Sequence, residues 1–274
     1  GTWDVVVTTP DLQTATLANG FTIESNTPHQ LRVDLIGRAT IRPDRRRAFD
    51  VVIQNLGNSD VFSVPLWIAR IPTSATVEPA FALTPPPQSG GEPDWSQAPM
   101  TFTGPGGKVL ALVIPRLPPG ITVRRFSLTV PNTVTSFQLT AAVAPPWADG
   151  NVFRSCLSGA GVITAPACMG AQLTAINAYL ATTPGIDALN GIGLWAKIAW
   201  QCEGAANLPA AIIKAQQVLD LMLQPIEQAG MPAGCSEVLQ PHWQDSLVVR
   251  VVTSMDPNEK LGAGGVGVNR LIGA

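Results

Sequence analysis

The chain carries few charges for its length. Of its 274 residues, 13% are Asp, Glu, Lys or Arg, which is about half the usual share of a soluble domain. The formal net charge is −2. Such a balance gives no electrostatic basis for binding nucleic acid or an anionic membrane surface, so we expect no nucleic-acid partner.

Long apolar runs are also missing. The stretch 186–200 is interrupted by Asn190, two glycines and Lys197, and the stretch 208–226 contains two prolines and two charged residues. Neither can form a membrane-spanning helix, so we expect no membrane span. With 46% hydrophobic residues, the chain can still bury a sizeable core and is too apolar to be disordered.

Residues typical of catalysis are scarce. The chain has two histidines, His29 and His242, and neither the G-x-S-x-G nor the H-E-x-x-H signature occurs. A Ser/His/Asp site would have to use His242 with the nearby Asp245, but we favour a packed surface histidine. We therefore assign no catalytic and no cofactor-binding residue, and we expect a protein that is not an enzyme.

The four cysteines lie together in one region, and the rest of the chain has none. Their spacing lacks the close pairs of a metal site, so it favours two disulfides and hence an oxidising compartment, secreted or at the cell surface. Three connectivities are open. We choose the sequential one, which closes the shorter loops. The four residues are Cys156, Cys168, Cys202 and Cys235.

Short β-type segments dominate residues 31–147. Strands are expected at 31–36, 48–54, 61–71, 109–114, 123–130 and 136–144, and this spacing predicts an Ig-like antiparallel β-sandwich. A Pro/Gly-rich stretch, 84–107, interrupts them and contains Trp95. A loop of this length is functional or mobile. Trp95 is our candidate for stacking on a sugar or anchoring a protein partner.

The character of the chain changes after residue 147. Residues 148–241 form a cysteine-containing helical module, with helices expected at 171–181, 186–200 and from Asn207 to Gly230. A valine-rich strand returns at 246–253 and should rejoin the sandwich. The fold class is therefore α+β, mainly β, with a disulfide-stapled helical insertion or side domain.

Residues 1–24 form a separate unit. Trp3, Val5 and Val7 alternate with Thr2 and Asp4, a turn follows at Thr9-Pro10-Asp11, and the run A-T-L-A-N-G-F comes after it. This pattern resembles the closing hairpin of the IPT/TIG Ig-like domain, with Leu12 where that family has glycine. The resemblance implies a chain cut from a longer multidomain protein. We expect the hairpin to pack on the following β region, or to join the sheet edge of another copy.

Residues 246–274 contain the returning strand and then the run S-M-D-P-N-E-K-L-G at 254–262. This run resembles the S-x-D-P-N-x-K-x-G junction between modules of very large secreted bacterial proteins. Asp256, Asn258 and Glu259 carry hard oxygens that suit Ca²⁺, although we favour a turn without an ion.

Together these features favour a non-enzymatic structural, adhesive or assembly module of a secreted or cell-surface multidomain bacterial protein. Its expected partners are neighbouring domains of the same polypeptide or other copies of the chain, with a surface glycan or protein as a further candidate. The alternatives are a secreted hydrolase with its site between sandwich and helices, and a carbohydrate-binding module.

Overall fold

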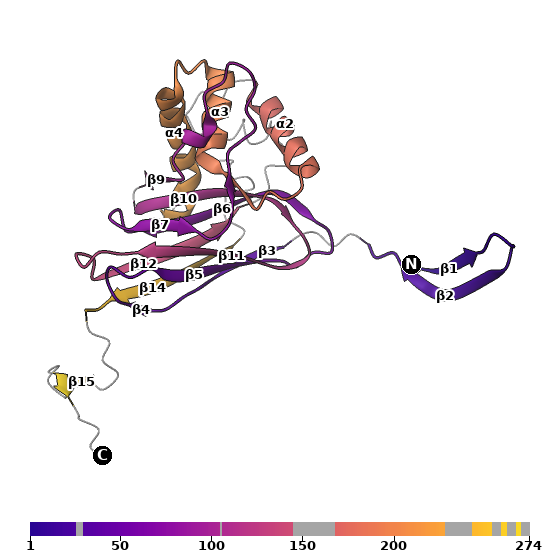
Figure 1. Ribbon diagram of the computed structural model, residues 1–274, viewed down its shortest axis with the longest axis horizontal. Coiled ribbons are helices and arrows are strands. Elements are labelled where there is room, and N and C mark those ends of the chain that lie inside the picture. The colour runs from indigo at the N-terminus through magenta and orange to yellow at the C-terminus, as the bar shows by residue number, and fades with distance from the viewer. Residues whose placement is uncertain are drawn as a thin grey trace.

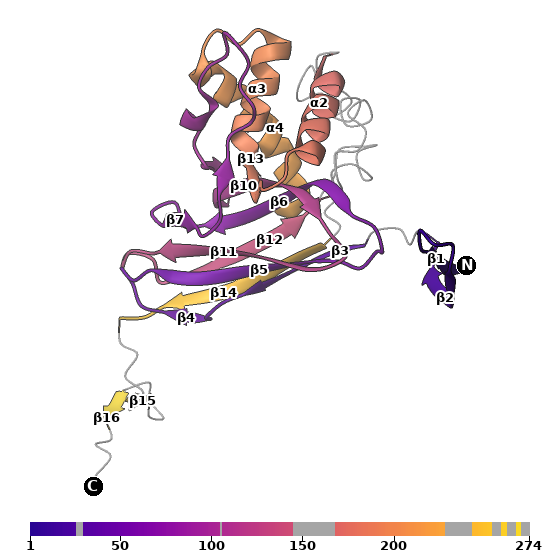
Figure 2. The same cartoon turned by 45° about the vertical axis from the view of Figure 1, so that its right-hand side comes forward.

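The computed structural model describes residues 1–25, 30–104, 106–144, 168–227, 243–253, 259–261 and 267–269. The body of the protein has three layers: a small β-sheet, a large β-sheet, and helices on the outer face of the large sheet (Figures 1 and 2). The small sheet is antiparallel, in the order β3 (Leu31–Ile36), β5 (Arg47–Asn55), β11 (Gly120–Thr129) and β7 (Thr76–Pro79).

The large sheet is built around the two long strands β6 (Val61–Ile71) and β10 (Gly107–Leu117), which pair antiparallel at its centre. β9 (Thr101–Gly104) also pairs with β10, off the main path of strands. The main order is β4 (Thr40–Ile41), β14 (Trp243–Val251), β12 (Ser136–Val143), β6, β10, β13 (Ala188–Asn190) and β8 (Leu83–Thr84).

Burial explains the sequence patterns of the two sheets. In β5, Phe49, Val51 and Ile53 are buried while the residues between them are at least partly exposed, as expected of a sheet with one wet face. In β6, by contrast, Leu66 faces the small sheet and the next residue, Trp67, packs against the helices. The large sheet is thus covered on both faces. The predicted sandwich is present, with a helical layer added to one side. Its long strands pair antiparallel as expected, but at the two ends of the large sheet β4 pairs parallel with β14 and β8 pairs parallel with β13.

The returning strand rejoins the sandwich, as the sequence predicts. β14 pairs antiparallel with β12 from Ser136 opposite Arg250 to Val143 opposite Trp243. The Asp245 carboxylate of β14 accepts a hydrogen bond of 2.8 Å from the Leu35 amide in β3. This contact links the two sheets at the edge where β14 lies.

Two neighbouring valines of β14 provide a test of this pairing. Val249 is fully buried in the core between the sheets, whereas Val248 is 58% exposed. We expect Val249→Asp to lower the free energy of unfolding by about 3 kcal/mol or more, because a carboxylate would enter an apolar core. Val248→Asp should change it by about 0.5 kcal/mol at most. Denaturant unfolding of both variants measures the difference, and equal effects would contradict the assigned face.

The helical region contains the strand β13 and three described helices, whose bounds follow. They are α2 (Met169–Thr182), α3 (Gly191–Glu203) and α4 (Leu208–Glu227). The Asn207 side chain accepts a hydrogen bond from the Ala210 amide at the start of α4, as its predicted capping role requires. The expected stop of this helix at Gly230 lies outside the described residues.

The helical region is not a separate module. The prediction of one helix over 186–200 is wrong at its start, because β13 precedes α3 and pairs with β10 in the large sheet. Residues from α2, α3 and α4 then share one core with the outward side chains of β6 and β10. The helices therefore form an insertion that completes the sandwich.

The N-terminal hairpin of β1 (Thr2–Thr8) and β2 (Thr14–Thr22) stands apart from the three layers (Figure 1). Every residue from Gly1 to Ser25 is exposed, so the prediction that the hairpin packs on the following β region is wrong. Leu12 keeps the left-handed backbone conformation, with φ 64°, that a glycine would adopt at this point of the turn. A second small pair is formed by β15 (Glu259–Leu261) and β16 (Gly267–Asn269).

Candidate functional site

The Pro/Gly-rich stretch forms a strap, residues 85–100, that runs along α3 (Figures 1 and 2). One face of α3 contacts this strap. The Asn190 side chain donates to the carbonyls of Ala98 and Pro99, at 3.3 and 3.2 Å, while its oxygen caps the helix by accepting from the amides of residues 192 and 193. A Cβ added at Gly193 would lie only 3.1 Å from a ring carbon of Pro86.

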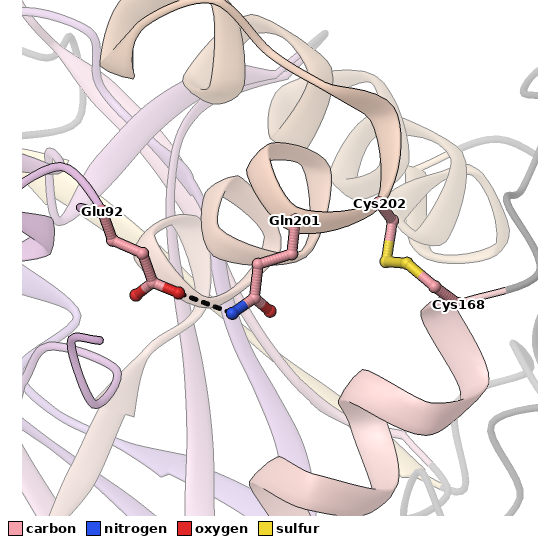
Figure 3. Close-up of a disulfide and its surroundings, with 4 residues drawn as sticks. All are labelled: Glu92, Cys168, Gln201 and Cys202. Carbon is pink, nitrogen blue, oxygen red and sulfur yellow. Dashed lines mark hydrogen bonds between the residues drawn. A yellow bond between two sulfur atoms is a disulfide. The ribbon is translucent and has the colours of Figure 1, made fainter. Parts of the chain in front are cut away.

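Glu92 is the centre of the contacts between strap and helix. One carboxylate oxygen accepts hydrogen bonds from the Ser89 amide at 2.9 Å, the Trp95 indole at 3.0 Å and the Lys197 ammonium at 2.9 Å. The other oxygen accepts from the Gln201 amide (Figure 3). Lys197 also donates to the Pro87 carbonyl. The strap is thus fastened to two successive turns of α3.

This ion pair is buried. The side chains of Lys197 and Glu92 are 6% and 7% exposed. Burial raises the pKa of the Glu92 carboxyl, but hydrogen bonds from Ser89, Trp95 and Lys197, with the charge of Lys197, outweigh it, and the pKa lies below its ordinary value. The carboxylate therefore stays ionised at neutral pH. The ionised Glu92 carboxylate contributes its full stabilisation of the fold above the ordinary pKa of a glutamate, about 4.3. This stabilisation is lost as the pH falls through the lowered pKa of Glu92.

Trp95 is part of the same cluster, and its predicted role is wrong. Only 1% of its surface is exposed, and it packs edge-on against Trp200 with 6.5 Å between ring centroids. It cannot stack on a sugar or anchor a partner in this conformation. Because the ring contacts Trp200 and the indole N–H is bound to Glu92, we interpret the cluster as a structural anchor of the strap.

Removing one partner of the buried pair tests this interpretation. Lys197→Met leaves the Glu92 charge buried without its counter-ion, so we expect a loss of about 3–5 kcal/mol in the free energy of unfolding. Lys214→Met is the matched control, because Lys214 pairs with Glu203 at 2.6 Å in a more exposed position, and it should cost at most about 1 kcal/mol.

The double variant Glu92→Leu/Lys197→Met should be more stable than Lys197→Met alone, since it buries no lone charge. The defect of Lys197→Met should also shrink as the pH falls through the lowered pKa of Glu92, because a protonated carboxyl needs no counter-ion. Urea unfolding across this pH range measures both effects. A defect that persists unchanged in the double variant and in acid would contradict the ion-pair interpretation.

A disulfide joins Cys168 at the start of α2 to Cys202 in the last turn of α3, with 5.6 Å between the two Cα atoms (Figure 3). The predicted sequential pairing is therefore wrong. Loop closure becomes only slowly more costly with length, so the fold rather than the sequence separation selects the partners. Cys202 follows Gln201 directly, and the same turn of α3 is bound to the strap and to α2. Cys156 and Cys235 lie outside the described residues.

Peptide mapping of the unreduced protein provides a direct check. We expect one linked pair to contain Cys168 and Cys202, and the second predicted disulfide can then join only Cys156 to Cys235. Four free thiols, or a peptide linking Cys156 to Cys168, would contradict both the fold of this region and the inference of an oxidising compartment.

Other predicted site residues are accounted for only in part. Asp256, Asn258, His29 and His242 lie outside the described residues, as does the side chain of Glu259, so the calcium site stays a prediction. Among the described residues, no cluster of three or more His, Cys, Asp or Glu could hold a metal ion, and no described helix is long and apolar enough to cross a membrane.

An open groove of about 420 Å³ lies at one edge of the sandwich, and nothing in the sequence pattern pointed to it. Arg125 and Asp50 form two hydrogen bonds of 2.7 and 2.9 Å on one wall, and the bonds from Arg125 lower the pKa of the Asp50 carboxyl. Arg124 donates to the Asp187 carbonyl. The aromatic residue in the lining is Phe81. Opposite charges thus already engage each other within the groove.

No protein-family model and no curated protein matches the sequence. Among solved structures, the chain is similar to the CARDB domain of the PF1109 protein from Pyrococcus furiosus in complex with di-metal ions, at 15% identity and a TM-score of 0.27, over 45% of this chain and 77% of that chain. The chain is similar to the solution structure of that domain at 14% identity and a TM-score of 0.24, over 42% of this chain and 74% of that chain.

The chain is also similar to AvmM, which catalyses macrocyclization in alchivemycin A biosynthesis, at 15% identity and a TM-score of 0.28, over 42% of this chain and 73% of that chain. With such low identities and TM-scores, these similarities do not identify a ligand or a reaction for this chain.

Proposed function

We propose that this chain is a non-enzymatic structural, adhesive or assembly module of a secreted or cell-surface multidomain protein. The observation that carries the proposal is the contrast between a densely filled three-layer body and a hairpin whose residues are all exposed. A two-stranded ribbon with exposed Trp3, Leu17 and Phe21 cannot bury its own apolar side chains. Such an element is suited to joining another β structure.

The disulfide supports the proposed compartment. Cystine bridges persist in oxidising surroundings, and the bond between Cys168 and Cys202 ties two helices of the body together. The partners we propose are neighbouring domains of the same polypeptide, in the manner of an IPT/TIG-like hairpin completing its Ig-like domain, or other copies of the chain.

The rival functions have weaker support. A carbohydrate-binding module using Trp95 would need that ring in solvent, but it is buried. For a hydrolase using Asp245, the carboxylate already accepts hydrogen bonds from the Leu35 and Ser246 amides and helps to hold the sheets together.

Hydrogen–deuterium exchange tests the assembly role. We expect the amides of residues 2–22 to exchange quickly in the isolated chain at high dilution and to be protected in the protein as its source cells secrete it. The amides of β6 and β10 should be slow in both and serve as the internal control. Fast exchange of the hairpin in both preparations would contradict the proposal.

A separate measurement tests the non-enzymatic part. We expect no covalent labelling of the folded chain by a fluorophosphonate probe. Labelling that is lost in His242→Ala would overturn this part of the proposal and favour the hydrolase.

A further inference from the structure

The two faces of the hairpin differ in chemistry. In the register of β1 and β2, Trp3 lies opposite Phe21 and Val5 lies opposite Leu17. The register shifts between Trp3 and Val5, where the single residue Asp4 of β1 lies opposite residues 18–20 of β2. The extra residues are therefore in β2, which also contains Asn19 with φ 55°, whereas β1 has no residue with positive φ. Because β1 keeps its alternation, Trp3, Val5 and Val7 lie on one face, together with Phe21 and Leu17. We name these five residues, Trp3, Val5, Val7, Leu17 and Phe21, the apolar face.

The opposite face is polar apart from one valine. It carries Val6 opposite Thr16 and Asp4 in the unpaired part of the register, and its other paired positions are threonines: Thr2, Thr8, Thr14 and Thr22. The hairpin is therefore amphipathic, and one of its two faces can gain by being covered.

The hairpin is held in shape by its own contacts. The Thr9 amide donates a hydrogen bond to the Gln13 carbonyl, and the Leu12 amide donates one to the Thr9 carbonyl, each at 2.9 Å. These two bonds close the turn. The Asp4 carboxylate accepts from the Asn19 amide at 2.8 Å, where the strand register shifts. Because Asp4 lies on the polar face and Asp11 lies in the turn, the apolar face carries no charge that a partner would have to desolvate.

We infer that the apolar face binds the same face of a second copy of this chain, a docking mode that rests on the assembly role proposed above. Two identical uncharged faces are self-complementary about a two-fold axis. The five side chains expose from 38% to 64% of their surfaces. Two copies would together bury about 1,000 Å², close to the lower limit for a specific interface.

The resulting assembly has two layers of two strands, with the apolar side chains between them and the threonine faces in solvent. A β structure needs about three or more strands with an apolar face to be stable in water. The four strands of the assembly meet this requirement, whereas an isolated hairpin does not. The small area implies a reversible dimer with a dissociation constant on the order of micromolar rather than an obligate one.

Two adjacent valines give a matched pair of variants. Val6 and Val7 are 58% and 59% exposed and lie in the same strand on opposite faces. We expect sedimentation velocity of the full chain from about 1 to 100 µM to show a reversible dimer in the wild type and in Val6→Asp. In Val7→Asp the association should weaken by about tenfold or more, because the dimer would bury two carboxylates in its apolar layer and no new contact would compensate for them.

A monomeric wild type over the whole range would overturn the inference, as would equal effects of Val6→Asp and Val7→Asp. Association that survives Val7→Asp would place the contact elsewhere on the molecule and would also overturn it. The assembly role is tested separately: a monomeric chain whose hairpin is nevertheless protected in the secreted protein would disprove the dimer and leave the neighbouring-domain role standing.

Discussion

The architecture depends on one constraint, that the large sheet must be covered on both faces. Consecutive residues of β6, such as Leu66 and Trp67, are both buried and belong to different cores. The small sheet covers one face, and the helices inserted between β12 and β14 cover the other. Removing either cover would expose a continuous apolar surface, so the helices belong to the stability of the sandwich itself.

Helix α3 is the element through which the helical layer is held together. Its first turn is capped by Asn190, which also binds the strap, and its later turns carry Lys197 and Gln201 to Glu92. Its last turn carries the disulfide to α2. A buried ion pair contributes little net stability compared with apolar packing, but it fixes one arrangement of the strap because any other leaves a charge unpaired.

The hairpin is the exception to this closed design. It presents Trp3, Leu17 and Phe21 to solvent, whereas the described aromatic side chains of the body are buried or half-buried, apart from Phe62. The body keeps its fold by internal contacts, and the hairpin carries the surface that we propose for association. This contrast is the basis of the assembly role proposed above.

Local pattern was enough to place many elements. The strands at 31–36 and 61–71 and the capping of α4 by Asn207 follow from side-chain alternation and from the hydrogen bonds that a helix start requires. The apolar character of 246–253 was enough to predict that this strand returns to the sandwich, because an isolated apolar strand has no place for its backbone hydrogen bonds.

Contacts between distant segments were decided by the tertiary structure. The burial of Trp95, the pairing of Cys168 with Cys202 and the meeting of Glu92 with Lys197 each join residues whose spacing in the chain carries no signal. The sequence by itself determined the positions of the long strands and of the described helices, and that cysteines would pair, but not the short strands β9 and β13. Only the packing of the strap and helices on the large sheet decided which residues meet, because burial and charge pairing depend on what lies opposite in space.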